Sequence, residues 1–307
     1  MASIQIVSDL HLSNQDYDNY HIERNAPYLA LLGDIGCVKD VGFVGFLNRQ
    51  LAEFHVVFHV LGNHEPYGSS WEDIREKLNS FQEANRKKRE EDPSSGIGEY
   101  VLMCQREYSI PSADITILGC TLFSNIPDSK LTPVSNGLND FREIDDWTVE
   151  EHCQRHKEDL EWLNTRIKAI AEDPRRKIVI LTHYSPTEDS RAVKPLHANS
   201  NLKSGFSTDL RDQPCWENPQ VKLWAFGHTH YNCDFVDEGT RKRVYTNQKG
   251  YSEGRSAGFR AGNVVQISQV LEQSPGALAH ASLILRAYTI NRRFETLVEE
   301  SSTRIIG

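Results

Sequence analysis

HVVFHVLGNHEP, residues 55 to 66, joins an almost continuous apolar run to a glycine and a cluster of polar side chains. Apolar runs of this kind predict a strand that is buried on both faces. Asn63, His64 and Glu65 follow at the point where that strand should end. Because polar residues are costly at the end of a core segment, we interpret this cluster as a candidate site.

The same plan recurs along the chain, with apolar runs that end in polar clusters. The other runs are IQIV (4–7), YLALLGD (28–34), ITILGCTLFS (115–124), KIVILTHYSP (177–186) and VKLWAFGHTH (221–230), with RVYTNQ (243–248) and NVVQIS (263–268) as further expected strands. Apolar residues at helical spacing lie between them, in residues 41–54, 71–81 and 160–170. Strands that alternate with helices predict an α/β architecture.

The composition is that of an ordinary globular protein. The chain has 307 residues, of which 38% are hydrophobic and 25% charged, and its formal net charge is −9. This acidic balance argues against a nucleic-acid binder. The six cysteines form no CxxC pair, and no apolar run approaches the roughly 18 residues of a membrane span. Since the first residues also lack the pattern of a signal peptide, we expect a cytoplasmic protein with free thiols and no membrane association.

Residue types that bind metals stand at the ends of the predicted strands. They are Asp9, His11, Asp34, Asn63, His183, His228 and His230. In DLH and HTH the two ligands are two residues apart, so on an extended chain they point to the same side. Carboxylate, imidazole and amide ligands suit Mn, Zn, Fe or Mg. Seven ligands are too many for one tetrahedral zinc, but they fit two ions that share a carboxylate.

The order of these motifs resembles that of the calcineurin-like metallophosphoesterases, in particular their small stand-alone members. DxH, GD, GNH[DE], a single histidine and GHxH follow one another between residues 9 and 230. The resemblance implies an αββα four-layer sandwich of two mixed β-sheets flanked by helices. We predict a single domain over residues 1–307, in which residues 270–307 form a partly helical extension to which we assign no role.

The resemblance also implies a role for each residue of the site. One metal ion would be held by Asp9, His11 and His230, a second by Asn63, His183 and His228, and both by the bridging carboxylate of Asp34. His64 would contact the substrate, stabilise the phosphoryl oxygens and protonate the leaving group. Glu65 would orient His64. The two divalent ions would be Mn, Fe, Zn or Mg.

The activity implied is hydrolysis of a small-molecule phosphoester by direct attack of a metal-bridging hydroxide. Phosphoryl transfer needs charge neutralisation and a nucleophile at neutral pH, which two adjacent ions supply. GDIGCVKD, residues 33 to 40, lacks the arginine that extends this motif in the protein phosphatase branch, which favours a phosphodiesterase. The alternatives are a phosphomonoesterase or protein phosphatase, a nuclease, a dimetal hydrolase with another substrate, and a non-catalytic scaffold.

Four further histidines are interpreted as structural. His55 and His59 lie inside the apolar run and are expected to pack there. His152 and His156 have the i, i+4 spacing of a zinc-binding helix, but the residues between them lack the glutamate of HExxH. We therefore predict that they lie on a solvated helix face.

Two segments rich in Pro, Gly and Ser, residues 90–99 and 124–137, are expected to be loops that could overhang the site. Asn125, Asp140 and Tyr184 stand near strand ends or in neighbouring loops and are candidates for contact with the substrate.

Overall fold

The computed structural model describes residues 2–251 and 256–267. Met1–Ser268 form one compact unit, and Gln269–Gly307 form a second unit that lies outside the described residues. The extension predicted for residues 270–307 therefore lies outside them as well. No helix in the described ranges is long and apolar enough to cross a membrane.

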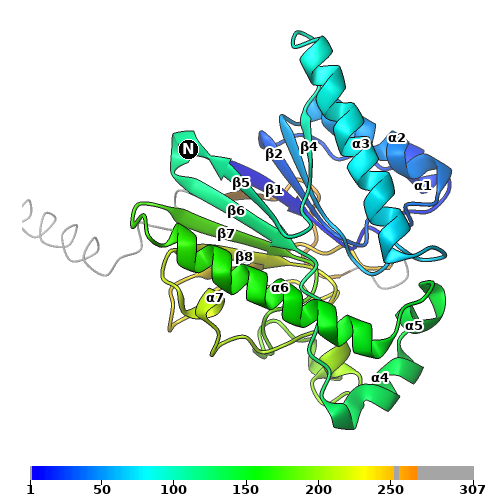
Figure 1. The fold of residues 1–307 in the computed structure, drawn as a ribbon, viewed down its shortest axis with the longest axis vertical. Helices are drawn as coiled ribbons and strands as arrows, with labels where there is room; N and C mark the ends of the chain where they lie inside the picture. The colour runs from blue at the N-terminus through cyan, green and yellow to red at the C-terminus, as the bar shows by residue number, and fades with distance from the viewer. Residues whose placement is uncertain (1, 252–255, 268–307) are drawn as a thin grey trace, which may run out of the picture. The chain divides into compact units, whose positions relative to one another are not determined.

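The described strands form two sheets (Figure 1), with the orders β11-β1-β2-β3-β4 and β5-β6-β7-β8-β10-β9. Their bounds are β1 Ser3–Val7, β2 Tyr28–Leu32, β3 Val56–Val60, β4 Glu99–Leu102, β5 Arg106–Ile110, β6 Ile115–Cys120, β7 Lys177–Thr182, β8 Val221–Phe226, β9 Asp234–Val236, β10 Arg243–Thr246 and β11 Val264–Gln266. Strands β1 to β4 are parallel, as are β6, β7, β8 and β10. Antiparallel β11, β5 and β9 occupy sheet edges, so both sheets are mixed.

The apolar runs are continuous because each central strand is buried on both faces. One set of side chains, which includes Ile6, Phe58 and Ile117, packs between the two sheets. Their neighbours along the chain point the opposite way and pack against the helices. The structure thus confirms the predicted αββα sandwich of two mixed sheets.

Helices cover the outer faces of the sheets. α2 (Val41–Glu53) and α3 (Trp71–Glu91) lie beside the first sheet, and α6 (Val149–Ile170) and α7 (Pro214–Glu217) lie beside the second (Figure 1). The shorter elements are α1 Asp16–Asn19, α4 Leu131–Gly137 and α5 Asp140–Glu143, with 3-10 turns at Pro111–Ala113, Asp128–Lys130, Pro195–His197 and Lys203–Gly205. The hydroxyls of Ser70 and Thr148 accept backbone N–H groups and cap the starts of α3 and α6.

Residues 90–99 do not overhang the site, contrary to the prediction. They connect the end of α3 to β4, and β4 pairs in parallel with β3 from its first residue, Val56 opposite Glu99. The loop therefore lies at the amino ends of these strands. Asn63 and His64 follow the carboxyl end of β3, at the other edge of the sheet.

His152 and His156 are buried, so the predicted solvated face of α6 is wrong. His152 Nε2 accepts the backbone N–H of Ser124 at 3.0 Å, and His156 Nδ1 lies 2.9 Å from the carbonyl oxygen of Leu122. Both imidazoles thus satisfy the backbone of the segment that follows β6. Buried polar groups with hydrogen-bond partners are common in proteins. Two histidines at i, i+4 spacing look the same in the sequence whether that helix face is buried or exposed.

Candidate metal centre

The loops after β1, β2, β3, β7 and β8 bring the predicted ligands together at one edge of the sandwich. Three groups of side chains place candidate ligand atoms within 4.8 Å of one another, namely Asp9–His11–His230, His11–Asp34–His64 and Asp34–His183–His228. His11 and Asp34 each belong to two of these groups. The ligands therefore form one continuous cluster, as a pair of neighbouring ions requires.

Asp34 lies at the middle of the cluster. Its Oδ1 is 3.4 Å from His183 Nε2, and its Oδ2 is 3.9 Å from the Nε2 atoms of both His11 and His64. Its side chain is almost completely buried. The two carboxylate oxygens thus face opposite halves of the site, which suits a bridging ligand.

The first half of the site is formed by Asp9, His11 and His230. The Nε2 atoms of the two histidines are 2.9 Å apart, and His230 Nε2 lies 3.3 Å from Asp9 Oδ1. Asp9 also accepts the backbone N–H of His228 at 3.0 Å, which fixes its orientation. Burial alone would raise the pKa of Asp9, but the hydrogen bond and charge of His230 hold it below its ordinary value. Imidazole and carboxylate lone pairs therefore converge on one point.

In the second half, the backbone fixes the tautomer of His183. Its Nδ1 lies 2.8 Å from the carbonyl oxygen of Leu32, so Nδ1 carries the proton. The lone pair of Nε2 then faces the interior of the site, 3.1 Å from Asn63 Oδ1. A hydrogen bond from the second ring nitrogen to a carbonyl is the usual way in which proteins orient a metal-binding histidine.

A network behind Asn63 orients its amide. Asn63 Nδ2 donates to Asp140 Oδ1 at 2.9 Å, and the hydroxyl of Tyr67 donates to the same oxygen at 2.6 Å. Because the amino group is held by Asp140, Asn63 Oδ1 faces His183. Asp140, a candidate for contact with the substrate, lines the cavity and orients a predicted ligand.

Several observations fit divalent cations in this site. His228 Nε2 is buried and has no hydrogen-bond partner in the described part of the chain, although an unpaired buried nitrogen is costly. Burial lowers the pKa of His228 well below its ordinary value and that of His11 to about 2, so both imidazoles are neutral, as metal ligands must be. Burial and the charges of Glu65 and Asp9 raise the pKa of Asp34 well above its ordinary value. Nearby cations would relieve this unfavourable negative charge.

The backbone of the site is unusual. Five of the seven predicted ligands have positive φ angles, between 47° and 69°: Asp9, His11, Asp34, His228 and His230. Asp and His tolerate this left-handed region better than most residues, and such strain gathers at functional sites. Glycine is needed beside them, because a Cβ on Gly62 would lie 2.5 Å from the backbone nitrogen of Asp34.

His64 lies where the site opens into a cavity. Its side chain is 19% exposed, its ring stacks on Tyr67 with centroids 4.2 Å apart, and its Nε2 lies 3.2 Å from the hydroxyl of Tyr251. Burial lowers the pKa of His64 to about 4, although the charge of Glu65 opposes this effect. A negatively charged phosphoryl group next to the ring would favour its protonated form.

Glu65 has different partners from those predicted. Its fully buried carboxylate accepts the backbone N–H groups of Gly62, Asp34 and Ile35 at 2.8 to 3.0 Å. His59, predicted to be a packing residue, is buried, and its Nε2 lies 3.6 Å from Glu65 Oε1. Glu65 therefore joins the loop after β2 to the loop after β3, and we find no hydrogen bond from its carboxylate to the His64 ring among the described residues.

Replacing Glu65 by alanine is expected to lower the free energy of unfolding of the metal-free protein by about 3–5 kcal/mol. Three buried N–H groups would lose their acceptor, and each unsatisfied donor costs about 1–3 kcal/mol before the structure relaxes. Urea denaturation measures the change. Glu83→Ala, on the exposed face of α3, serves as the control and should leave the midpoint almost unchanged. Equal midpoints for the two variants would contradict the proposed role of Glu65.

Sequence reasoning did not identify two aromatic residues of the site. Tyr67 stacks on His64 and binds Asp140, whereas Tyr251 is 51% exposed and its ring lies 4.2 Å from that of His11. Tyr67 stands beside the NHE motif, so its position was a usable signal. Tyr251 belongs to no motif, and only the structure brings it to the site.

The chain is similar to proteins of one family. The sequence model of the family described as calcineurin-like phosphoesterase matches residues 2–232. An uncharacterized protein of Acanthamoeba polyphaga mimivirus is 28% identical over an alignment of 295 positions, which covers 88% of this chain and 99% of that protein.

Two solved structures resemble the fold. The phosphopantetheinyl hydrolase of Mycobacterium tuberculosis matches with a TM-score of 0.64 at 14% identity, over 89% of this chain and 98% of that one. A dimetal phosphatase from Danio rerio matches with a TM-score of 0.47 at 15% identity, over 80% and 86% of the two chains. The family match spans every motif of the site, and the chain belongs to the calcineurin-like phosphoesterase family.

Proposed function

We propose that this protein is a dinuclear-metal-dependent phosphodiesterase that hydrolyses a small organic phosphoester. The observation that carries the proposal is the position of Asp34, which is shared by ligand groups on either side of it and lies beside His64 at the edge of a cavity. When bound, two divalent ions in such a site neutralise the phosphoryl oxygens and supply a nucleophile at neutral pH. Mn, Fe, Zn and Mg all suit these ligands.

The residues of the chain would supply the remaining parts of the reaction. Asn63 and the histidines would hold the cations, which would in turn orient the phosphoryl group. His64 Nε2 faces the cavity, from which it can protonate the oxygen of the leaving group. Tyr67 and Tyr251 contact its ring on two sides and limit its movement.

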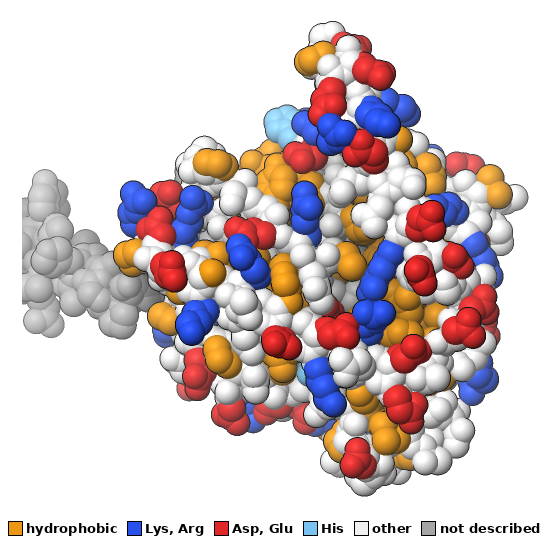
Figure 2. All heavy atoms as spheres, in the orientation of Figure 1, with side chains coloured by type: hydrophobic (Ala, Val, Ile, Leu, Met, Phe, Trp, Pro, Cys, Tyr) orange, Lys and Arg blue, Asp and Glu red, His pale blue; other side chains and the backbone are white. Residues whose placement is uncertain are grey.

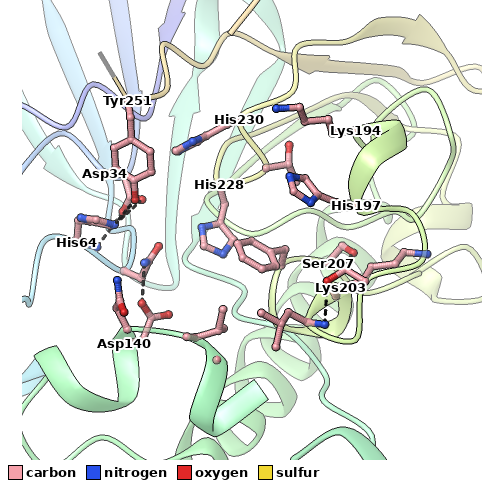
Figure 3. Close-up of a pocket in the computed structure, with 18 of the residues that line it drawn as sticks. Asp34, His64, Asp140, Lys194, His197, Lys203, Ser207, His228, His230 and Tyr251 are labelled. Atoms are coloured by element: carbon pink, nitrogen blue, oxygen red, sulfur yellow. Dashed lines mark hydrogen bonds and ion pairs between the residues drawn. The ribbon is translucent and has the colours of Figure 1, made fainter. Parts of the chain in front are cut away.

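A diester is favoured over a monoester by the charge of the cavity. The described lining residues include no arginine, and Lys39, in the motif that carries arginine in protein phosphatases, is not among them. The two lysines of the lining, Lys194 and Lys203, lie across the cavity from Asp34 and His64 (Figure 3). A phosphodiester carries one negative charge and needs fewer cationic groups than a monoester dianion. On the face shown in Figure 2, acidic and basic side chains are interspersed and form no basic track, which does not favour a nuclease.

The purified protein is expected to contain about two divalent ions per chain and to hydrolyse aryl phosphodiesters at least about tenfold more efficiently than the matching monoesters. Elemental analysis identifies the metals, and a panel of substrates is then assayed with those metals. A preference for monoesters would replace the diesterase by a phosphatase with the same chemistry. Cleavage of DNA or RNA on a gel would favour the nuclease, and a metal-loaded protein inactive on every phosphoester would contradict the proposal.

A further inference from the structure

The cavity extends well beyond the metal centre. Its volume is about 970 Å³, at the upper end of the range for small-molecule sites and far more than a phosphoryl group needs. Residues in and beside the metal centre, among them Asp34, His64 and His230, line one part of the cavity, and residues 137–140 and 193–207 line most of the remainder. These two segments therefore define the space that is open to the organic part of a substrate.

The wall next to the metal centre is apolar and well packed. Leu138, Leu202 and Phe206 line the cavity, and all three belong to a small hydrophobic cluster around Val134. The segments interlock tightly, because a Cβ on Gly137 would lie 2.5 Å from Leu202 Cδ2, and one on Gly205 would lie 2.6 Å from Leu138 Cδ1. This close packing therefore fixes the position of the apolar wall.

The cavity is also lined by basic side chains, among them Lys194. Figure 3 shows Lys194 and His197 across the cavity from Asp34 and His64. Lys203 is already paired, with its Nζ 2.6 Å from Glu188 Oε2. Lys194 is exposed and forms no ion pair within residues 2–251 and 256–267. The charge of Lys194 is thus available to a ligand.

We propose that the cavity binds an extended organic phosphoester that carries a second anionic group. The phosphoryl group would lie at the metal centre, the apolar body along Leu138, Leu202 and Phe206, and the second anion beside Lys194 and His197. This inference rests on the proposed function and names the substrate class of the same site. A short phosphate ester does not belong to this substrate class, because it would leave both the apolar wall and Lys194 without contacts.

Calorimetric titration of the metal-loaded full chain with three phosphate monoesters tests the inference without relying on turnover. Hexyl phosphate is expected to bind at least about tenfold more tightly than methyl phosphate, because its longer chain can bury apolar surface against Leu138, Leu202 and Phe206. The hexyl phosphate with a terminal carboxylate is expected to bind about tenfold more tightly again at low salt. This second gain should shrink at high salt, because Lys194 is exposed.

The variant Lys194→Gln is expected to abolish the gain from the carboxylate and to leave the affinity for hexyl phosphate unchanged. Lys168→Gln, on the exposed face of α6, is the matched control and should behave like the wild type. If methyl phosphate binds and neither the chain nor the carboxylate adds affinity, the inference is overturned while the proposed function stands. If no alkyl phosphate binds although aryl phosphodiesters are hydrolysed, the inference is overturned and the proposed function stands. If no alkyl phosphate binds and no phosphodiester is hydrolysed, both fail.

Discussion

Asp34→Asn is expected to reduce phosphoester turnover by about a thousandfold or more, equivalent to about 4 kcal/mol of transition-state stabilisation. The amide has the shape of the carboxylate but no charge, and one of its two ends is a donor. Asp34 faces His183 through one oxygen and His11 and His64 through the other, so an amide can serve only one half of the site. Elemental analysis should show a loss of bound metal in parallel with the loss of rate.

The same substitution should not harm the metal-free fold. Burial and neighbouring negative charges raise the pKa of Asp34 above its ordinary value in the absence of cations. The stability that protonated Asp34 contributes is therefore fully present below the pKa of Asp34 in the unfolded chain. It is lost as the pH rises through the pKa of Asp34 in the folded protein. Asparagine removes this loss, so metal-free Asp34→Asn should unfold at the same or a higher urea concentration than metal-free wild type at neutral pH.

Asp159→Asn is the control for this experiment. Asp159 is also buried, and it accepts the backbone N–H of Leu122, but it lies outside the ligand cluster. Burial raises the pKa of Asp159 to about 6, so its neutral carboxyl form is readily reached, and the neutral amide of asparagine resembles that form. Its variant should keep both metal and most of its activity. Full activity and metal content in Asp34→Asn would show that the carboxylate is not shared between two ions.

The ligand cluster could be predicted from the sequence because its geometry follows from the strands. Asp9 and His11 follow the apolar run of β1 closely, and parallel strands present their carboxyl ends at one edge of the sheet. The prediction that the two side chains share a side because the chain is extended was wrong in its reason, since both residues lie beyond β1 with positive φ angles. The loops at the opposite edge could not be placed in this way. Residues 90–99 have the composition of a site loop, and only the pairing of β4 with β3 shows that they lie elsewhere.

Polar residues outside the motifs were harder to interpret, because their partners lie far away in the sequence. Glu65 follows His64 directly, which suggests a partnership, but its carboxylate binds the backbone of Asp34 and Ile35 from another loop. Tyr251 reaches His64 across 187 positions of sequence. Contacts of this kind depend on how loops from different strands fold over one another, and no periodicity in the sequence encodes them.

The second large effect is expected for His64→Ala, which should keep the bound metal and lower the turnover number by about a hundredfold to ten-thousandfold. The loss should be greatest for substrates with poor leaving groups, because an alkoxide needs a proton more than a nitrophenolate does.

Asn63→Ala should show the opposite pattern. Removing the amide of Asn63 should weaken metal binding by at least about tenfold, and added metal should restore part of the rate.

Comparing His64→Ala with Asn63→Ala separates two roles, proton donor and metal ligand, that the distances in the site do not distinguish. A ring nitrogen of His64 lies within 4.8 Å of candidate ligand atoms of His11 and Asp34, so His64 could bind a cation itself. Rates for a series of aryl and alkyl leaving groups, measured at saturating metal, provide the test. His55→Ala is the control, because His55 is exposed and does not pack in the core as predicted. A proton donor would make the rate of His64→Ala depend more steeply on the pKa of the leaving group. If His64→Ala instead loses metal and responds equally to all leaving groups, His64 is a ligand, and the proton must come from elsewhere in the cavity.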